Sequence, residues 1–354
     1  MTDRATRIAL LGAYPPVYGG ISVHVWRLHQ TLKATHTVDV LDMYSSRSAP
    51  AVDGVHRLAG NPMAMLLGAR RLLSRLRADI LHVHVSAFKK FLLTAPVLLT
   101  GGHHRARILT IHGGKLGQNL EAFAPWQLRL FDWTLTRFDH IVCVSEAQRQ
   151  LLLERGIDAE RMSVINAYLP PVPHTNSAQF GPLEQRRRDG KRILLVAAQF
   201  LPHYGLLDLL EALHQLPSTL RETVCLAHVS YLDADDSYRA ACLDAVGDLD
   251  YVAFDNLEPP DMAAWMALGD VFVRPTWWDG DAVSLREACF FNNRVVATDV
   301  TTRPEGAVLC AARDSAGLAA ALQQVLADDD AGTVSFDHLA SQRLLESVYA
   351  TVLG

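Results

Sequence analysis

The chain has 354 residues, of which 49% are hydrophobic and 20% are charged, and its formal net charge is −5. This length exceeds that of one ordinary hydrophobic core and predicts two domains of about 150–180 residues each. The balance excludes a disordered or collagen-like chain, and the acidic net charge excludes the global basic field that is typical of nucleic-acid-binding proteins.

Short, strongly apolar runs alternate with longer helical patterns along the first half of the chain. Strands are expected at 7–13, 37–43, 80–85, 106–112, 140–145 and 162–167, and helices at 20–34, 62–77, 87–100, 120–137 and 146–155. Strands that are almost continuously apolar and alternate with helices indicate a parallel sheet whose two faces are both covered.

A segment with four prolines, several polar residues and a run of arginines interrupts this pattern at 168–191. The alternation then restarts, with strands at 192–198, 223–229, 251–256, 270–275, 294–299 and 307–310 and helices at 205–215, 236–246, 260–267, 283–291, 314–327 and 335–353. We therefore predict two doubly wound α/β domains, residues 1–172 and 192–334, with a linker at 173–191. The last residues, 335–354, form a helix that is expected to cross back to the first domain. Ligands bind beyond the carboxyl ends of the strands in such sheets, so two facing domains are expected to share a cleft.

Glycines and histidines stand at the carboxyl ends of expected strands in the first domain. Gly19 and Gly20 follow the first strand and open a helix, which lets backbone N–H groups approach a phosphate or a sugar; a plain turn explains them equally well. His112 ends another strand, a position that would face the cleft; the alternative, which the residues alone favour slightly, is a hydrogen-bonded loop histidine. His82 and His84 share one face of a strand, but they lack a cysteine or carboxylate partner in the sequence, so a zinc site is not expected.

The second domain begins with a comparable strand, loop and helix. Gly205 opens the helix, at a position that suits a diphosphate. The polar side chains that precede it are Gln199, His203 and Tyr204.

The stretch "PTWWDGDAVSLREA", at 275–288, places aromatic and acidic residues between a buried strand and a helix. Asp279 and Glu287 are eight residues apart and suit hydrogen bonds from sugar hydroxyls, at about 1.5–3 kcal/mol for each bond to a charged group. The alternative is that Ser284 and Glu287 form a capping box and that Asp281 also caps the helix. Capping leaves the other large side chains of this region without a role, which favours a ligand site. These are Arg274, Trp277 and Trp278.

Five sequence blocks occur in one order over nearly the whole chain: "YPPVYGGISVHV", "ADILHVH", "TIHGG", "FDHIVCVSEAQRQLLLERGIDAERMSVI" and "DVFVRPT…EA…RVVATDV…PE". This order resembles glycosyltransferase family 4, retaining nucleotide-sugar enzymes of the GT-B fold with two Rossmann-like domains. The resemblance implies transfer of a sugar from a nucleotide-sugar donor to a glycan or lipid-linked glycan, with retention, as in bacterial surface polysaccharide synthesis. It also implies that no metal and no other cofactor is needed.

The resemblance assigns roles to the candidate residues. Gly19 and Gly20 would face the donor phosphates and the acceptor, and His112 would lie near the transferred sugar. Asp279 and Glu287 would form the two ends of the family's E-x7-E motif, here a DGD-x-x-S-x-R-E-A variant, with Glu287 at the ribose. Further donor contacts are expected from Gln199, Tyr204, Gly205, Gly280, Asp281 and Ser284.

The sequence departs from the family at the diphosphate. Gln199 and Tyr204 stand where the family has an arginine and a lysine. A bound diphosphate needs cations, because a helix N-terminus supplies only about half a charge. We hypothesise that arginines of neighbouring loops carry this charge, since a guanidinium group can bind phosphate through two parallel hydrogen bonds. The candidates are Arg274, Arg286 and Arg303. The alternative is that these arginines pair with the carboxylates of the same loops in a structural network.

Two expected helices of the first domain combine basic and apolar residues. The stretch 68–79 carries four arginines, and the stretch 88–99 is apolar with two lysines at its start. This pattern suits the surface of an anionic membrane, although a solvated helix and a buried helix explain it equally well. The most apolar run, 91–100, is too short to span a bilayer. No signal peptide is seen, and the five cysteines show no CxxC spacing. A cytoplasmic protein is therefore expected, with the inner face of the cell membrane as a further position.

Two other classes of protein remain open. The replacement of the family's arginine and lysine by Gln199 and Tyr204 also fits an inactive GT-B protein that binds a glycan or nucleotide. The architecture fits another sugar-nucleotide enzyme such as an epimerase or phosphorylase.

Overall fold

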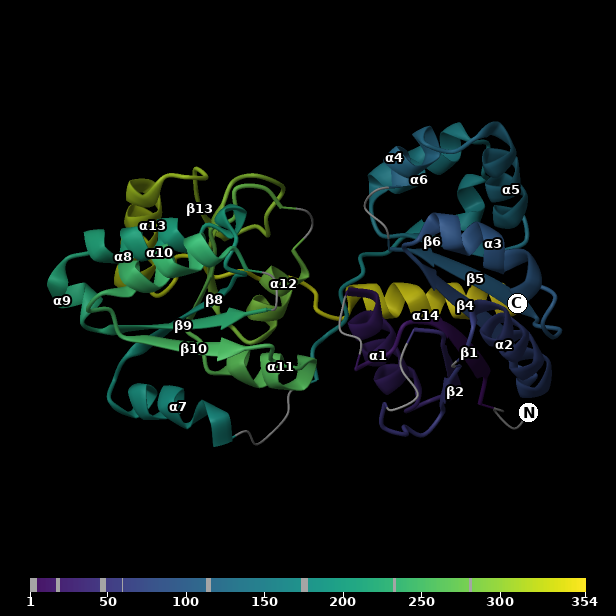
Figure 1. Cartoon of the computed structure of the whole chain (residues 1–354), viewed down its shortest axis with the longest axis horizontal. Coiled ribbons are helices and arrows are strands. Elements are labelled where there is room, and N and C mark those ends of the chain that lie inside the picture. The colour runs from purple at the N-terminus through teal and green to yellow at the C-terminus, as the bar shows by residue number, and fades with distance from the viewer. Residues whose placement is uncertain are drawn as a thin grey trace. The chain divides into compact units, whose positions relative to one another are not determined.

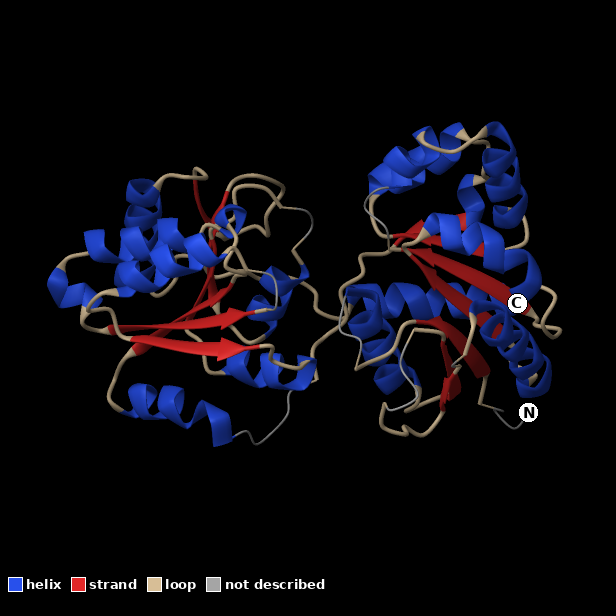
Figure 2. Cartoon of the chain, viewed as in Figure 1, coloured by secondary structure: helices blue, strands red, loops and turns tan. Residues whose placement is uncertain are grey.

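The computed structural model describes residues 5–16, 20–44, 49–58, 60–112, 116–172, 178–231, 234–279 and 282–354. The chain divides into two compact units (Figure 1). Unit 1 comprises Met1–Leu169 and Leu339–Gly354, and unit 2 comprises Pro170–His338. Each unit is a parallel sheet flanked by helices (Figure 2), so the predicted pair of doubly wound α/β domains is confirmed.

Unit 1 has a seven-stranded sheet with the order β3-β2-β1-β4-β5-β6-β7. Its strands are β1 (Arg7–Gly12), β2 (Thr37–Asp42), β3 (Val55–Arg57), β4 (Ile80–Val85), β5 (Ala106–Ile111), β6 (His140–Cys143) and β7 (Met162–Val164). Its helices are α1 (Gly20–Leu32), α2 (Pro62–Leu76), α3 (Phe88–Leu98), α4 (Leu116–Glu121), α5 (Pro125–Leu135), α6 (Glu146–Glu154) and α14 (Ala340–Leu353). Buried residues of α2, α3 and α5 pack in one core, and those of α1 and α14 pack in another, so both faces of the sheet are covered.

Unit 2 has a six-stranded sheet with the order β10-β9-β8-β11-β12-β13. Its strands are β8 (Arg192–Ala197), β9 (Val224–Ser230), β10 (Tyr251–Asp255), β11 (Val271–Arg274), β12 (Arg294–Thr298) and β13 (Val308–Cys310). Its helices are α7 (Gly181–Arg188), α8 (Leu206–Gln215), α9 (Ser218–Arg221), α10 (Asp236–Val246), α11 (Pro259–Ala267), α12 (Val283–Phe290) and α13 (Ser315–Ala327). One core includes buried residues of α8, α10 and α13, and the other includes those of α7, α11 and α12.

The segment expected to be a linker is largely folded. Residues 173–177 lie outside the described residues, but the rest of the segment contains a short 3-10 helix (Ala178–Phe180) and α7. Phe180 and Leu183 are buried in the core of unit 2, while the arginines of α7 are largely on its outer face. The arginine run thus decorates a short amphipathic helix, which is why composition alone suggested a linker.

A second difference lies in unit 1, where the single helix expected at 120–137 is replaced by α4 and α5. Pro125 is the first residue of α5, a position where its missing N–H costs no helical hydrogen bond, so a new helix begins there. The short edge strand β3 was not predicted. Across the described ranges, no helix has both the length and the apolar character that a membrane span requires.

Candidate functional site

Each sheet has one point where the strand order reverses, and ligands of doubly wound folds bind at the carboxyl ends of the strands there. In unit 1 the chain runs outward from β1 to β3 and returns on the other side of β1 at β4. In unit 2 the corresponding point lies between β8 and β11. The loops that follow these strands carry most of the candidate residues predicted from the sequence.

The two loops at the reversal point of unit 2 pack closely together. The backbone N–H of Trp277 donates a 2.9 Å hydrogen bond to the carbonyl of His203. Gly205 has a φ of +69°, and a Cβ atom there would lie 1.9 Å from the carbonyl oxygen of Pro275. Both its conformation and this close approach require glycine. Gly205 therefore fixes the position of the start of α8 beside the loop after β11.

Asp279 is bound by two arginines. Arg274 donates from Nε and Nη2 to the two carboxylate oxygens at 2.9 and 3.1 Å. Arg303 donates from Nη1 to Asp279 at 3.0 Å and from Nε to the carbonyl of Thr298 at 2.9 Å. The side chains of Arg303, Asp279 and Arg274 are 1%, 10% and 16% exposed. Two of the candidate arginines thus pair with a carboxylate of the same region, and these three groups together carry one positive charge.

The electrostatics of this network favour an ionised Asp279. Burial opposes its ionisation, but the hydrogen bonds and charges of Arg274 and Arg303 outweigh burial and hold the pKa of Asp279 below its usual value. The Arg274 guanidinium also lies 5.8 Å from the ring centre of Tyr204. A cation is therefore present next to one of the two positions where the family's cations are missing.

The two tryptophans of the loop have different surroundings. Trp277 donates from Nε1 to Asp208 at 2.6 Å, and the Arg313 guanidinium lies 4.2 Å from its ring centre. Trp278 is exposed, and its ring is stacked on His203 at 4.7 Å. Trp277 therefore ties its loop to α8, whereas Trp278 offers an open aromatic face for a base or a sugar.

The capping alternative for Glu287 is wrong. Helix α12 begins at Val283, and its N-cap is Ala282, which has no side-chain group that could cap it. Ser284 is therefore inside the helix, where it cannot form the predicted capping box. Glu287 is half-buried, and together with burial its charge raises the pKa of Tyr231 to about 12.

The remaining candidates are scattered around these loops. Gly280 and Asp281 lie outside the described residues, so the capping role of Asp281 stays a prediction. Gln199 follows β8 and is half-buried, as is Arg286 on α12.

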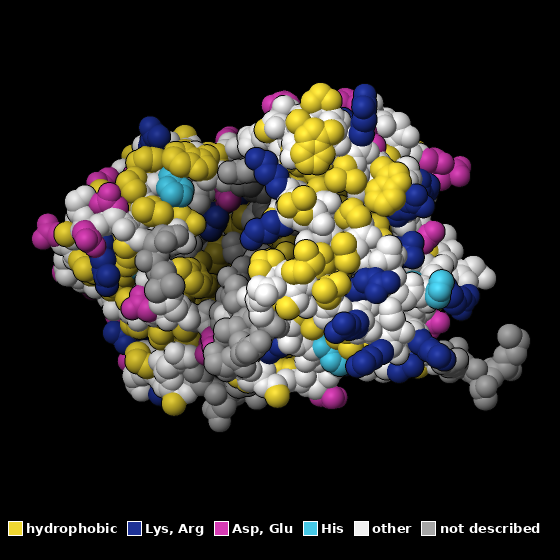
Figure 3. Space-filling model, turned by 45° about the vertical axis from the view of Figure 1, so that its right-hand side comes forward, with side chains coloured by type: hydrophobic (Ala, Val, Ile, Leu, Met, Phe, Trp, Pro, Cys, Tyr) yellow, Lys and Arg dark blue, Asp and Glu magenta, His cyan; other side chains and the backbone are white. Residues whose placement is uncertain are grey.

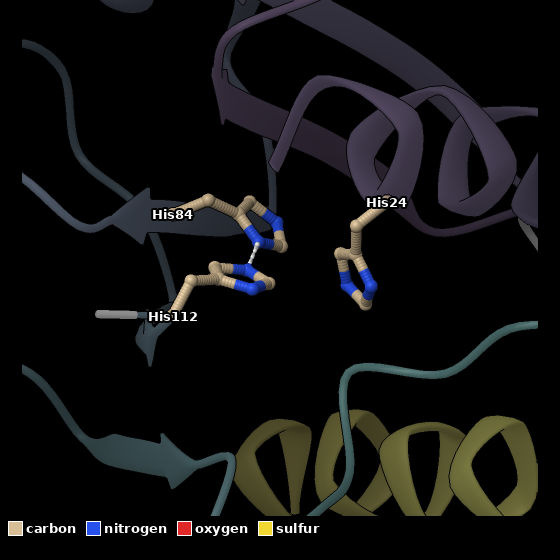
Figure 4. Close-up of side chains that lie close together, drawn as sticks. All are labelled: His24, His84 and His112. Carbon is tan, nitrogen blue, oxygen red and sulfur yellow. Dashed lines mark hydrogen bonds between the residues drawn. The ribbon is translucent and has the colours of Figure 1, made fainter. Parts of the chain in front are cut away.

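Three histidines meet at the reversal point of unit 1 (Figure 4). His24 comes from α1, His84 from the end of β4 and His112 from the residue after β5. His84 Nδ1 and His112 Nε2 share a 3.0 Å hydrogen bond, and the rings of His24 and His112 are 4.7 Å apart. His24 Nδ1 donates to the carbonyl of Ala167 at 2.8 Å, which leaves a lone pair on Nε2. We call these three residues the histidine cluster.

Burial makes the cluster neutral. It lowers the pKa of His24 to about 4 and those of His84 and His112 well below their usual value. Among the described residues, the buried Nε2 of His84 has no hydrogen-bond partner. The cluster can therefore bind a neutral hydroxyl group, whereas it offers no charge to a phosphate.

The ligand atoms of the cluster lie within 4.8 Å of one another, close enough for one divalent cation. No carboxylate belongs to this group, and two of its nitrogens already share a hydrogen bond. The expectation that no metal is needed stays a prediction.

The neighbouring His82 is fully bonded, to Tyr349 Oη and Thr110 Oγ1, each at 2.7 Å. It links α14 to the sheet, as expected of a structural histidine. Gly20 is the first residue of α1, one turn before His24, while Gly19 lies outside the described residues. His24 was not singled out from the sequence, although it follows the glycine pair by one helical turn.

Similarity to known proteins identifies the family. Residues 18–167 match the model described as Glycosyltransferase Family 4, and residues 190–328 match the model described as Glycosyl transferases group 1, so the two matches span most of the chain. The chain belongs to the family 4 type of glycosyltransferases. No curated protein matches its sequence significantly.

Solved structures match this glycosyltransferase over nearly its whole length. Anabaena HepE in complex with UDP and glucose has a TM-score of 0.67 at 14% identity, covering 98% of this chain and 100% of that one. Sucrose-phosphate synthase from Thermosynechococcus elongatus has a TM-score of 0.67 at 17% identity, covering 98% and 99%. WaaG, a glycosyltransferase involved in lipopolysaccharide biosynthesis, has a TM-score of 0.58 at 15% identity, covering 97% and 95%. The predicted GT-B fold is thus confirmed.

Proposed function

We propose that this glycosyltransferase transfers a sugar from a nucleotide-sugar donor to a glycan or lipid-linked glycan, with retention, in bacterial surface polysaccharide synthesis. Unit 2 binds the donor and unit 1 binds the acceptor. The observation that carries this proposal is the guanidinium of Arg274, held by Asp279 beside Tyr204 at the reversal point of unit 2. The presence of UDP and glucose in HepE, and the role of WaaG in lipopolysaccharide biosynthesis, support it by analogy.

The donor diphosphate would be bound by the Arg274 guanidinium and the start of α8. Asp279 accepts from Nε and Nη2 of Arg274, so a phosphate oxygen would approach Nη1. The N-terminus of α8 at Gly205 adds about half a positive charge. Glu287 would accept hydrogen bonds from the ribose hydroxyls. The Arg274 network and the helix N-terminus would offset most of the diphosphate charge without a metal ion.

The transfer would break the bond between the sugar's anomeric carbon and the diphosphate oxygen and form a new bond to an acceptor oxygen on the same face. The acceptor's hydroxyl proton would pass to the departing diphosphate. The neutral histidine cluster would orient the hydroxyl groups of the sugars through hydrogen bonds rather than supply a charge. The enzyme would act in the cytoplasm, at the inner face of the cell membrane when its acceptor is lipid-linked.

The test is calorimetric titration of UDP, GDP, ADP and dTDP into the wild-type protein, a Glu287→Ala variant and a Glu211→Ala control. Glu211 is an exposed residue of α8. We expect one nucleotide to bind the wild type and the control at micromolar concentration and to bind Glu287→Ala at least tenfold more weakly. Absence of binding to the folded wild type would refute a nucleotide donor. For retention, the anomeric configuration of the product is read by NMR.

A second candidate is an inactive protein that binds a nucleotide or glycan. It is favoured by the pairing of both arginines with Asp279, which gives them a structural role. Turnover of the bound donor, including slow hydrolysis, would exclude this candidate. Conversion of the donor's sugar without an acceptor would instead identify an epimerase.

A further inference from the structure

An apolar groove of about 500 Å³ opens at the reversal point of unit 1. Its lining includes Leu11 of β1, Val83 of β4, and residues of the first turns of α2 and of α3. This volume lies in the range of about 300–1,000 Å³ that is usual for small-molecule sites. The groove thus has the size of a ligand site and the position at which this fold binds ligands.

The groove is continuous with the histidine cluster. His84 lines the groove and is hydrogen-bonded to His112 within the cluster. At the opposite walls, Met63 and Leu93 line the groove while remaining exposed. Exposed apolar side chains that gather around a concave surface indicate a binding site. Figure 3 shows apolar side chains gathered on unit 1 with lysine and arginine side chains beside them.

The charges around the groove select the kind of ligand. Lys90 lines it, and no aspartate or glutamate occurs among the described residues that do so. The sequences of α2 and α3 contain five basic residues and no acidic residue. Of these five, Lys90 is the one that lines the groove. An apolar interior with a lysine at its edge and no carboxylate among its described lining residues complements an amphiphile with an anionic head.

We propose that this groove holds the hydrocarbon chain of an amphiphilic acceptor, with the anionic linking phosphate at Lys90 and the acceptor sugar toward His84. This inference rests on the proposed function and names the class of its acceptor. The groove contributes affinity through the chain, while the histidine cluster selects the hydroxyl group. Chain length is therefore a determinant of acceptor binding.

The probes are butyl, hexyl and octyl phosphate, titrated below the concentration at which they form micelles. Each methylene that leaves water raises the association constant by up to about fourfold, so affinity should rise steeply along this series. Met63→Glu places a charge at the groove, and Leu67→Glu places the same charge one turn further along α2. Met63 and Leu67 are 64% and 42% exposed, and only Met63 lines the groove. Both variants should therefore fold.

We expect Met63→Glu to abolish the dependence on chain length and Leu67→Glu to preserve it. Lys90→Gln should weaken binding of every alkyl phosphate by a similar factor, and Lys89→Gln, on the same helix but outside the groove lining, should not. Equal affinity for the three probes, or equal effects of the two glutamate variants, would overturn the proposal. Association with anionic vesicles but not with monomeric probes would also overturn it and would indicate a membrane-docking surface.

These titrations contain no nucleotide, so their failure can be told apart from failure of the proposed function. A protein that binds a nucleotide but shows no chain-length dependence would remain a glycosyltransferase with a different acceptor class. A protein that binds alkyl phosphates but no nucleotide would refute the donor and leave the groove as an amphiphile site.

Discussion

Replacing Arg274 by alanine removes the cation that we assign to the donor diphosphate. Its side chain is only 16% exposed, so a phosphate bound there would be largely shielded from water. A hydrogen bond to a charged group contributes about 1.5–3 kcal/mol, which corresponds to a loss of about 10–160-fold in nucleoside diphosphate affinity. The assay is calorimetry with the preferred nucleoside diphosphate and with the matching nucleoside. We expect the loss for the diphosphate and little change for the nucleoside.

The rival explanation is that Arg274 only holds Asp279 in place. Asp279 keeps its 3.0 Å bond to Arg303 when Arg274 is removed, so the loop retains one of its ties. A phosphate clamp predicts that Asp279→Asn, which frees the guanidinium, preserves or strengthens diphosphate binding. A purely structural pair predicts that Arg274→Ala and Asp279→Asn weaken the nucleoside and the diphosphate alike. That second result, in folded variants, would refute the clamp.

Three further changes test the architecture around the sites. Gly205→Ala should destabilise unit 2 by about 1–2 kcal/mol from backbone strain alone. It should also displace the loop at Pro275 and so weaken nucleotide binding. Urea unfolding measures the loss of stability, with Gly181→Ala as the control because Gly181 has open space around it. Tyr349→Phe should lower the free energy of unfolding of unit 1 by about 1–3 kcal/mol, because His82 loses its partner; hydrogen exchange of the unit 1 sheet measures this. Burial holds the folded-state pKa values of His82 and the histidine cluster below the unfolded value near 6.5. The free energy of unfolding should therefore be highest above pH 6.5 and should fall by about 1.4 kcal/mol per pH unit for each histidine as the pH decreases toward 4. A flat profile of unfolding free energy over this range would contradict the assignment of neutral imidazoles.

The sequence predicts the strand and helix pattern well because both sheets are parallel and their strands are continuous apolar runs. The misjudged segments are those in which burial is concentrated in one or two residues. In α7, Phe180 and Leu183 make the core contacts, while charged and polar residues dominate the composition. The break before α5 follows from Pro125, a signal that was present but outweighed by the apolar pattern around it.

The positions of candidate residues were predictable where they depend on the end of a strand, as for His112 and Arg274. They were not predictable where a contact joins distant segments. The bond that Trp277 donates to Asp208 spans 69 residues, and no local pattern encodes such a distance. His24 joined the cluster only through the placement of α1 against the sheet. The alternative of a capping box failed because it depends on the residue at which α12 begins, the least certain feature of any predicted helix.

The two reversal points differ in charge, and this difference supports the substrates that we propose for them. The Arg274 network carries a net positive charge that the loop fixes in place, whereas burial keeps the histidine cluster neutral. A diphosphate can be neutralised only by the first, and a hydroxyl group beside a hydrocarbon chain suits the second. Salt should therefore act on the two sites differently. At 0.15 M ionic strength the Debye length is about 8 Å, so added sodium chloride should weaken nucleotide binding. The gain in affinity per methylene at the groove should stay constant, because it comes from the transfer of hydrocarbon out of water. Nucleotide affinity that rises on addition of sodium chloride would contradict an electrostatic contact with the diphosphate.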